Sequence, residues 1–159
     1  MIHVKSARKA APLLIGLAAG VLLAVPVGWG SQEAVGPSTI PITNRQVGYQ
    51  RVDVGRLGTS AGDVEIITQS LYNRRVTTKS IGHADLVCTF VGSRARSCRG
   101  TYFLPRGKLV VGGSLRFRQF YELAVLGGTG VYNNARGTLT VTRTATKPSR
   151  DIVLFRLVG

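Results

Sequence analysis

Short stretches of alternating apolar and polar residues dominate the chain after residue 35. They are rich in β-branched residues and are separated by Gly, Pro, Asn or Ser, which is typical of strands joined by turns. The pattern predicts strands at residues 39–43, 63–71, 76–80 with 84–91 (one interrupted strand or two), 97–104, 108–117, 120–126, 138–144 and 151–158. Residues 44–61 are polar and predict a long loop. We therefore expect an all-β domain of roughly eight antiparallel strands, and periodicity alone leaves a barrel and a sandwich both open.

A glycine-dense block between two of these strands has two interpretations. Its landmarks are Gly127, Gly128, Gly130, Arg136 and Gly137. An apolar strand followed by Gly-Gly-Thr-Gly also begins a dinucleotide-binding loop, but that motif requires a third glycine and then a helix. Asn133 stands at the third position, and strand-like residues follow. We interpret the block as a sharp turn that Arg136 braces.

The first 34 residues differ from the rest of the chain. Lys5, Arg8 and Lys9 form a basic start without an acid, and residues 11–27 are almost wholly apolar. This is the layout of a secretory signal peptide. A retained N-terminal anchor is the alternative, although the apolar run is shorter than the roughly 20 residues that a span needs. Both alternatives make residues 35–159 one secreted or extracytoplasmic domain.

Cys88 and Cys98 are the two cysteines of the chain, and they flank a polar turn. Folding the adjoining strands onto each other places the two sulfurs opposite, which predicts a cross-strand disulfide in an exported domain. Two buried, reduced thiols are the alternative. We expect no metal site, because His83 is the other soft ligand in this part of the chain and zinc needs three or four ligands.

The chain is strongly basic, with 21 Lys and Arg against 7 Asp and Glu and a formal net charge of +14. Such a charge attracts anionic polymers and surfaces. The arginines are spread along the chain, and no aromatic–basic spacing resembles an RNA-reading sheet. We therefore expect no specific nucleic-acid partner, and a solvated basic surface that associates loosely with anionic envelope polymers.

The order and spacing of several landmarks resemble the allene oxide cyclase and dirigent-like β-barrel family from Gly62 to near the C-terminus. These landmarks are Gly62-Asp63-Val64, Leu71-Tyr72, Gly82, Cys88, Tyr102-Phe103, residues 107–113, Leu123-Ala124-Val125, Gly127-Gly128-Thr129-Gly130 and Ala135-Arg136-Gly137. The resemblance implies a calycin-like eight-stranded antiparallel barrel, often a homotrimer, with an apolar lumen and no cofactor. Cyclases of this family fold an unsaturated epoxide into a cyclopentenone, and dirigent proteins couple phenoxy radicals with one handedness. Both act mainly by restricting the conformations of a small molecule.

The chain departs from the cyclase pattern in its first strand, where the cyclases carry a lumen glutamate. Residues 40–46 contain no acid, and Asn44 is the one side chain there that resembles a surviving polar ligand contact. This departure argues against allene oxide cyclase activity itself.

Two other carboxylates are candidates for acid–base catalysis. Glu122 precedes an apolar strand, and its alternative role is to pair with a cross-strand arginine. Asp85 interrupts an apolar run, and its alternatives are a place on the solvent face or in a turn. The candidate ligand contacts are Asn44, Tyr72, Tyr102 and Tyr121, although aromatic residues in strands also serve packing.

Three functions follow from these observations. The first is an exported, cofactor-free barrel that binds a small apolar or aromatic molecule and steers its cyclisation or coupling, as a cyclase or isomerase does. The second is a barrel that binds such a molecule without turnover. The third is a basic envelope-associated structural protein whose interior is filled by Phe103, Phe117, Phe120 and Phe155. The sequence leaves the choice open, because fold alone does not settle function.

Overall fold

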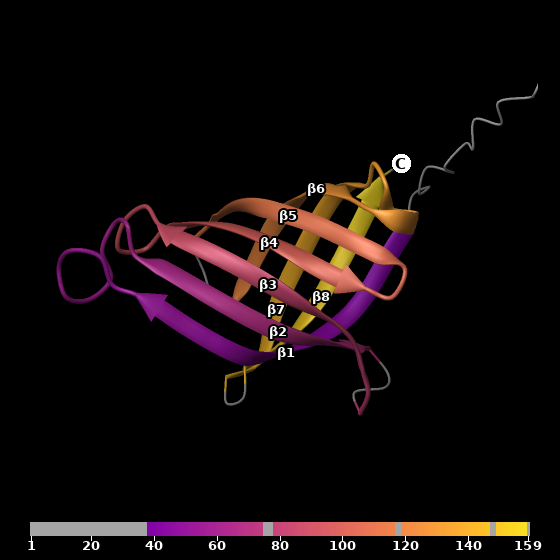
Figure 1. Ribbon diagram of the computed structural model, residues 1–159, viewed down its shortest axis with the longest axis horizontal. Helices are drawn as coiled ribbons and strands as arrows, with labels where there is room; N and C mark the ends of the chain where they lie inside the picture. The colour runs from indigo at the N-terminus through magenta and orange to yellow at the C-terminus, as the bar shows by residue number, and fades with distance from the viewer. Residues whose placement is uncertain (1–37, 75–77, 117–118, 147–148, 159) are drawn as a thin grey trace, which may run out of the picture. The chain divides into compact units, whose positions relative to one another are not determined.

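The computed structural model describes residues 38–74, 78–116, 119–146 and 149–158. They form a closed barrel of eight antiparallel strands (Figure 1). The strands are β1 (Ser38–Val52), β2 (Val64–Asn73), β3 (Ser80–Phe90), β4 (Arg96–Leu104), β5 (Gly107–Leu115), β6 (Phe120–Gly128), β7 (Arg136–Thr146) and β8 (Ser149–Val158). The predicted export segment, residues 1–34, lies outside the described residues. Within the described residues, no helix has the length and apolar character to cross a membrane.

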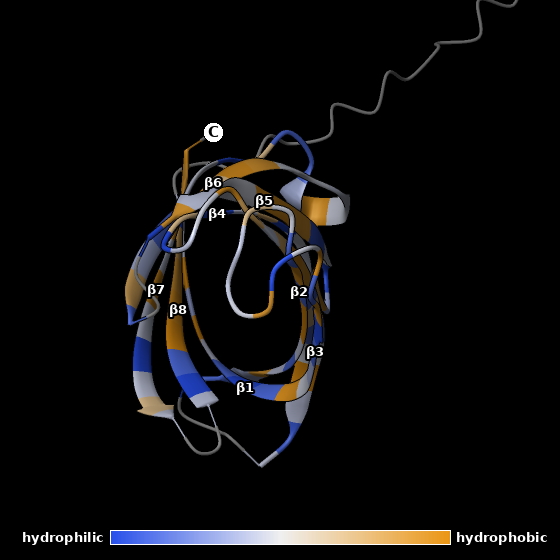
Figure 2. Ribbon diagram, turned by 90° about the vertical axis from the view of Figure 1, so that its left-hand side faces the viewer, coloured by the Kyte–Doolittle hydropathy of each residue, from blue (hydrophilic) through white to orange (hydrophobic). Residues whose placement is uncertain are grey.

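Each strand pairs with its sequence neighbours, and β1 closes the barrel by pairing with β8 as well as with β2. Figure 2 shows the strands as a closed ring. The choice that periodicity left open is therefore settled in favour of the barrel. A closed ring leaves no sheet edge for pairing with another chain.

β1 is longer than the sequence pattern predicted. The expected short piece at residues 39–43 continues to Val52, and only residues 53–63 form the loop before β2. The prediction was wrong because the lumen-facing positions Asn44 and Gln46 are polar, so the apolar alternation ends while the strand continues. The pairing of β1 with β2 then shifts register at Val47, which is typical of a β-bulge.

Apolar side chains from most of the strands fill much of the barrel interior. The fully buried ones include Leu71, Leu109, Val111, Leu139, Val141, Val153 and Phe155. The Phe155 ring meets Tyr102 edge-on, with ring centroids 5.1 Å apart. Two of the phenylalanines expected to fill the interior do not: Phe103 stacks on His83, and Phe120 is 54% exposed. Phe117 lies outside the described residues.

The glycine block makes the sharp turn that the sequence predicted. Gly130 has a φ of 64°, and a Cβ atom there would lie 2.4 Å from a backbone carbonyl oxygen of the facing turn. Gly137 has a φ of 139°, and its Cβ would lie 1.9 Å from the carbonyl oxygen of Arg156. Arg136 donates a hydrogen bond to the Ala135 carbonyl oxygen at 2.9 Å. Between β6 and β7, the short 3-10 turn η1 (Gly130–Tyr132) stands where the dinucleotide-binding motif requires a helix, so that interpretation is excluded.

The predicted disulfide joins Cys88 of β3 to Cys98 of β4. The two residues are directly paired across the strands, and their Cα atoms are 4.0 Å apart. Both are buried on the lumen side of the barrel wall. The bond therefore fixes β3 to β4 close to the turn that joins them.

Asp63 orders the loop of residues 53–63. Its carboxylate accepts hydrogen bonds from the backbone N–H groups of Ser60 at 2.8 Å and Val54 at 2.9 Å, and it pairs with Arg51 at 2.7 Å. These hydrogen bonds, the backbone ones foremost, hold the pKa of Asp63 below its usual range. The loop is thus held against the end of the barrel where β3 runs into β4, because Phe90 donates its backbone N–H to the Asp63 carbonyl oxygen.

Candidate functional site

Six polar side chains gather inside the barrel among the apolar ones. We call them the inner polar cluster: Asn44, Gln69, Tyr102, Tyr121, Arg143 and Asp151. Asp151 begins the inward-facing row of β8, and its Oδ1 accepts a hydrogen bond from Arg143 Nε at 2.9 Å. The Asp151 backbone N–H donates to Asn44 Oδ1 at 3.1 Å, across the pairing that closes the barrel. Residues 40–46 of β1 hold no acid, and the neighbouring strand β8 thus supplies a buried one beside Asn44.

Several atoms of the inner polar cluster have no hydrogen-bond partner among the described residues. They are Asp151 Oδ2, Asn44 Nδ2, Tyr102 Oη and Gln69 Oε1. A buried polar atom without a partner costs about 1–3 kcal/mol, and native proteins contain few of them. Four such atoms inside one barrel provide both donors and acceptors for the polar group of a bound molecule.

The two tyrosines of the cluster stay protonated at neutral pH. Burial first, and then the nearby charge of Asp151, raises the pKa of Tyr121 to about 12. Burial also raises the pKa of Tyr102 well above its ordinary value, and Tyr121 and Asp151 add to the shift. Both hydroxyls can therefore donate hydrogen bonds to a carbonyl group or to an oxygen that becomes negative.

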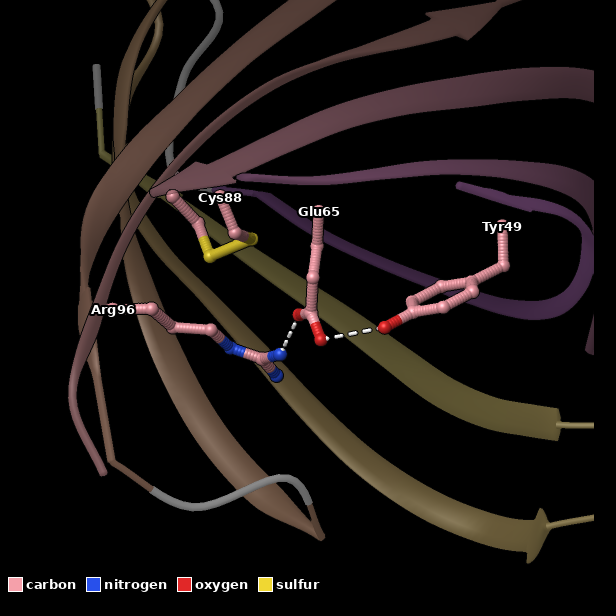
Figure 3. The surroundings of a disulfide bond; sticks show 5 residues. Tyr49, Glu65, Cys88 and Arg96 are labelled. Carbon is pink, nitrogen blue, oxygen red and sulfur yellow. Dashed lines mark hydrogen bonds and ion pairs between the residues drawn. A yellow bond between two sulfur atoms is a disulfide. The ribbon is translucent and has the colours of Figure 1, made fainter. Parts of the chain in front are cut away.

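A second set of polar side chains meets between this cluster and one end of the barrel. Glu65 of β2 is fully buried; its Oε2 pairs with Arg96 Nη1 and its Oε1 accepts a hydrogen bond from the Tyr49 hydroxyl at 2.8 Å. Figure 3 shows the three side chains meeting inside the barrel, beside the disulfide. Both carboxylate oxygens of Glu65 are engaged, whereas Asp151 keeps one oxygen available. Asp151 is therefore the better candidate for a proton acceptor.

Arg96 stands between two hollows of very different size. Outside it, an open basin of about 750 Å³ is lined by Thr59, Phe90, Gly92, Ser93, Arg94, Ala95, Arg96 and Arg116. Inside it, a cavity of about 20 Å³ is lined by Gln46, Gln69, Tyr121, Arg143, the disulfide and apolar residues. The inner cavity has room for about one water molecule. The Arg96 side chain, held by Glu65, is the group that lines both hollows.

The structure separates the candidate residues into two groups. Asn44, Tyr102 and Tyr121 point into the barrel, as a ligand contact must. Tyr72 is on the outer face, where its ring centre is 5.9 Å from the Arg45 guanidinium carbon.

The two candidate acids are also on the outer face. Glu122 is exposed and accepts a hydrogen bond from Thr140 Oγ1 at 3.2 Å, so its cross-strand partner is a threonine. The Asp85 side chain is 51% exposed, and its Oδ2 is 3.9 Å from His83 Nε2. Asp85 thus occupies its alternative place on the solvent face, and neither acid reaches the lumen, because alternation along β3 and β6 turns their neighbours inward.

Sequence reasoning missed Glu65, Arg96, Arg143 and Asp151. A signal for the two acids was present, because each stands in phase with inward-facing residues of its own strand: Glu65 with Ile67 and Leu71, and Asp151 with Val153, Phe155 and Leu157. Among the described residues, no group of three or more His, Cys, Asp and Glu side chains could hold a metal ion.

Comparison with known proteins identifies the fold. No protein-family model and no curated protein sequence matches the chain. A solved structure of a pyocyanin demethylase is 25% identical, with a TM-score of 0.67, and the match covers 76% of this chain and 100% of that one.

Two further solved structures share the fold at lower identity. A pterocarpan synthase dirigent protein has a TM-score of 0.59 at 16% identity and covers 76% of this chain and 87% of its own. An exo-specific intermolecular Diels–Alderase has a TM-score of 0.59 at 16% identity, and the match covers 78% of this chain and 99% of that one. The chain thus has the barrel fold that dirigent proteins and Diels–Alder cyclases also use.

Proposed function

We propose that this barrel binds a small, mostly apolar or aromatic molecule and steers its cyclisation or coupling. The observation that carries the proposal is the inner polar cluster, where Asp151, Asn44, Tyr102 and Gln69 hold buried polar atoms that no described residue satisfies. A molecule with one polar group and an apolar body matches this environment, because the surrounding wall is apolar. Hydrogen bonds to the guest would offset the cost of burying these atoms.

The proposed step uses the side chains of the cluster. Asp151 accepts a proton through its available Oδ2, while Arg143 holds Oδ1 and fixes the orientation of the carboxylate. The Tyr102 and Tyr121 hydroxyls donate hydrogen bonds to the oxygen on which negative charge develops. The apolar wall restricts the flexible part of the substrate to the conformation that closes or couples correctly.

Entry to the cluster requires Arg96 to move. Pockets for small molecules usually measure about 300–1,000 Å³, so the inner cavity of about 20 Å³ admits no such molecule by itself. The outer basin of about 750 Å³ has the necessary size. We infer that a substrate first occupies this basin and reaches the cluster when the Arg96–Glu65 pair opens.

The similar structures support this assignment. The pyocyanin demethylase, by its name, acts on pyocyanin, and the match covers all of its chain and 76% of this one. Allene oxide cyclase activity is not part of this proposal, because residues 40–46 of β1 hold no acid and the buried carboxylate of the cluster comes from Asp151 of β8. The export of the domain and its assembly as a homotrimer remain predictions from the sequence and the resemblance.

The test has two readouts on the full chain. Calorimetric titration with pyocyanin measures binding, and chiral chromatography measures the enantiomeric excess when phenoxy radicals couple in the presence of the protein. We expect saturable binding and a coupling bias, and we expect Asp151→Asn to lose at least about tenfold in affinity or most of the bias.

Glu122→Gln is the matched control, because it removes a carboxylate from the outer face of the barrel. It should leave both readouts unchanged. Absence of binding would contradict the proposal as a whole. Binding without bias would contradict the steering step and assign the second function, a barrel that binds without turnover.

A further inference from the structure

We propose that the outer basin is an anion site, so that the ligand is an aromatic molecule carrying a carboxylate. This inference rests on the proposed function and specifies its substrate class. Three of the residues that line the basin are arginines, namely Arg94, Arg96 and Arg116, and none is an acid. A concave surface with charges of one sign concentrates ligands of the opposite sign.

The acids of the barrel do not neutralise two of these arginines. Asp63 pairs with Arg51, Glu65 with Arg96 and Asp151 with Arg143. Arg94 and Arg116 form no ion pair or hydrogen bond with any of the residues at 38–74, 78–116, 119–146 and 149–158. Among the described residues, no acid therefore competes with an incoming anion for these two guanidinium groups.

The chemistry of arginine selects the kind of anion. A guanidinium group is a planar fork of N–H donors that matches a carboxylate in two parallel hydrogen bonds. It also makes cation–π interactions with aromatic rings: the guanidinium carbons of Arg51 and Arg96 lie over Phe90, 5.5 and 5.9 Å from its ring centre. Phe90 adds an apolar wall to the basin, and its side chain is itself nearly buried. A planar ring with an attached carboxylate satisfies both features.

The basin lies outside Arg96, so a ligand would contact its arginines before it reaches the lumen. Arg96 lines the basin and also the inner cavity. An anionic group held by Arg94 and Arg116 would place the apolar body of the same molecule against Phe90 and Arg96. The other end of the molecule, which carries the uncharged polar group that the inner polar cluster binds, then faces the barrel interior.

The experiment compares two probes that share a ring and differ in charge, 2-naphthoate and 2-naphthamide. Fluorescence anisotropy of each probe, titrated with the full chain at low salt, gives its dissociation constant. We expect 2-naphthoate to bind about tenfold more tightly than 2-naphthamide. The ratio should shrink as salt is added, because exposed charges are screened.

Two double variants separate the basin from the net charge. Arg94→Gln with Arg116→Gln should bring 2-naphthoate to the affinity of 2-naphthamide. Arg99→Gln with Arg156→Gln removes the same number of charges from the outer faces of β4 and β8, and should preserve the ratio. Circular dichroism of both double variants confirms that each is folded.

The outcomes distinguish this inference from the proposed function. Equal affinity of the protein for the two probes would overturn the anion site. An equal loss of 2-naphthoate affinity in both double variants would also overturn it, because the preference would then come from the general surface charge. Retained binding of 2-naphthamide with loss of affinity in Asp151→Asn would leave the proposed function standing. Failure of both probes to bind would contradict both claims.

Discussion

Replacing Glu65 by glutamine tests the ionic interactions inside the barrel. The Glu65 side chain is fully buried, and it holds Arg96, whose side chain is only 11% exposed. Glutamine keeps the shape but removes the charge, so the Arg96 guanidinium is left buried without its counter-ion. Removal of one partner from a buried ion pair costs about 3–5 kcal/mol. Each kcal/mol lowers the melting temperature of a domain of this size by about 3–5 °C, so we expect a loss of about 10 °C or more.

A double-mutant cycle isolates the pair itself. Glu65→Gln and Arg96→Met each remove one charge, and the combined variant removes both. Because neither charge is then left alone, the combined loss should be smaller than the sum of the single losses by about 1–3 kcal/mol. Urea unfolding followed by circular dichroism measures the three free energies, provided that the m-value stays constant. Additive losses, or single losses below about 1 kcal/mol, would refute the buried pair.

Three further predictions concern the disulfide, the glycine turn and the buried tyrosines. Reduction of the Cys88–Cys98 bond, which closes a loop with a sequence separation of 10, should lower the free energy of unfolding by about 2–3 kcal/mol, as measured in urea with and without reductant. Gly137→Ala should lower the free energy of unfolding by more than about 2 kcal/mol, because the left-handed backbone and the close carbonyl leave no room for a Cβ. The control Gly92→Ala places its Cβ where no atom lies within 4 Å, and it should cost less than about 1 kcal/mol in the same assay. Folding raises the pKa of Tyr121 to about 12, so the folded state binds the hydroxyl proton more tightly than the unfolded state. The resulting stabilisation is complete below about pH 10 and is lost as the pH rises toward 12, which urea unfolding at a series of pH values measures. A free energy of unfolding that stays constant across that range would contradict the burial of this hydroxyl.

The sequence predicted the fold well because most strands bury apolar side chains at every second position. Alternation identifies β8, with Val153, Phe155 and Leu157 inward. The disulfide followed from the same logic, since two cysteines flanking a turn must face each other when the strands pair. β1 was the exception, because Asn44 and Gln46 are polar residues in inward-facing positions.

The site was harder to predict because its chemistry depends on which face of each strand points inward. The sequence predicts Asn44, Tyr102 and Tyr121 as ligand contacts, and all three face the lumen, but the candidate acids Glu122 and Asp85 alternate outward. Asp151 stands at the start of an apolar strand, where a charged residue looks like a boundary. Only the pairing of β8 with β1 places its carboxylate deep in the barrel beside Asn44.

The most direct test of the central claim observes the inner polar cluster while a ligand binds. Nuclear magnetic resonance of the full chain, titrated with pyocyanin, follows the side-chain amide groups of Asn44 and Gln69 in the lumen and of Gln50 on the outer face of β1. The account predicts that the Asn44 and Gln69 signals shift saturably with the ligand and that the Gln50 signal does not. Shifts confined to Gln50 and other outer-face groups, or no shifts at saturating ligand, would contradict binding inside the barrel.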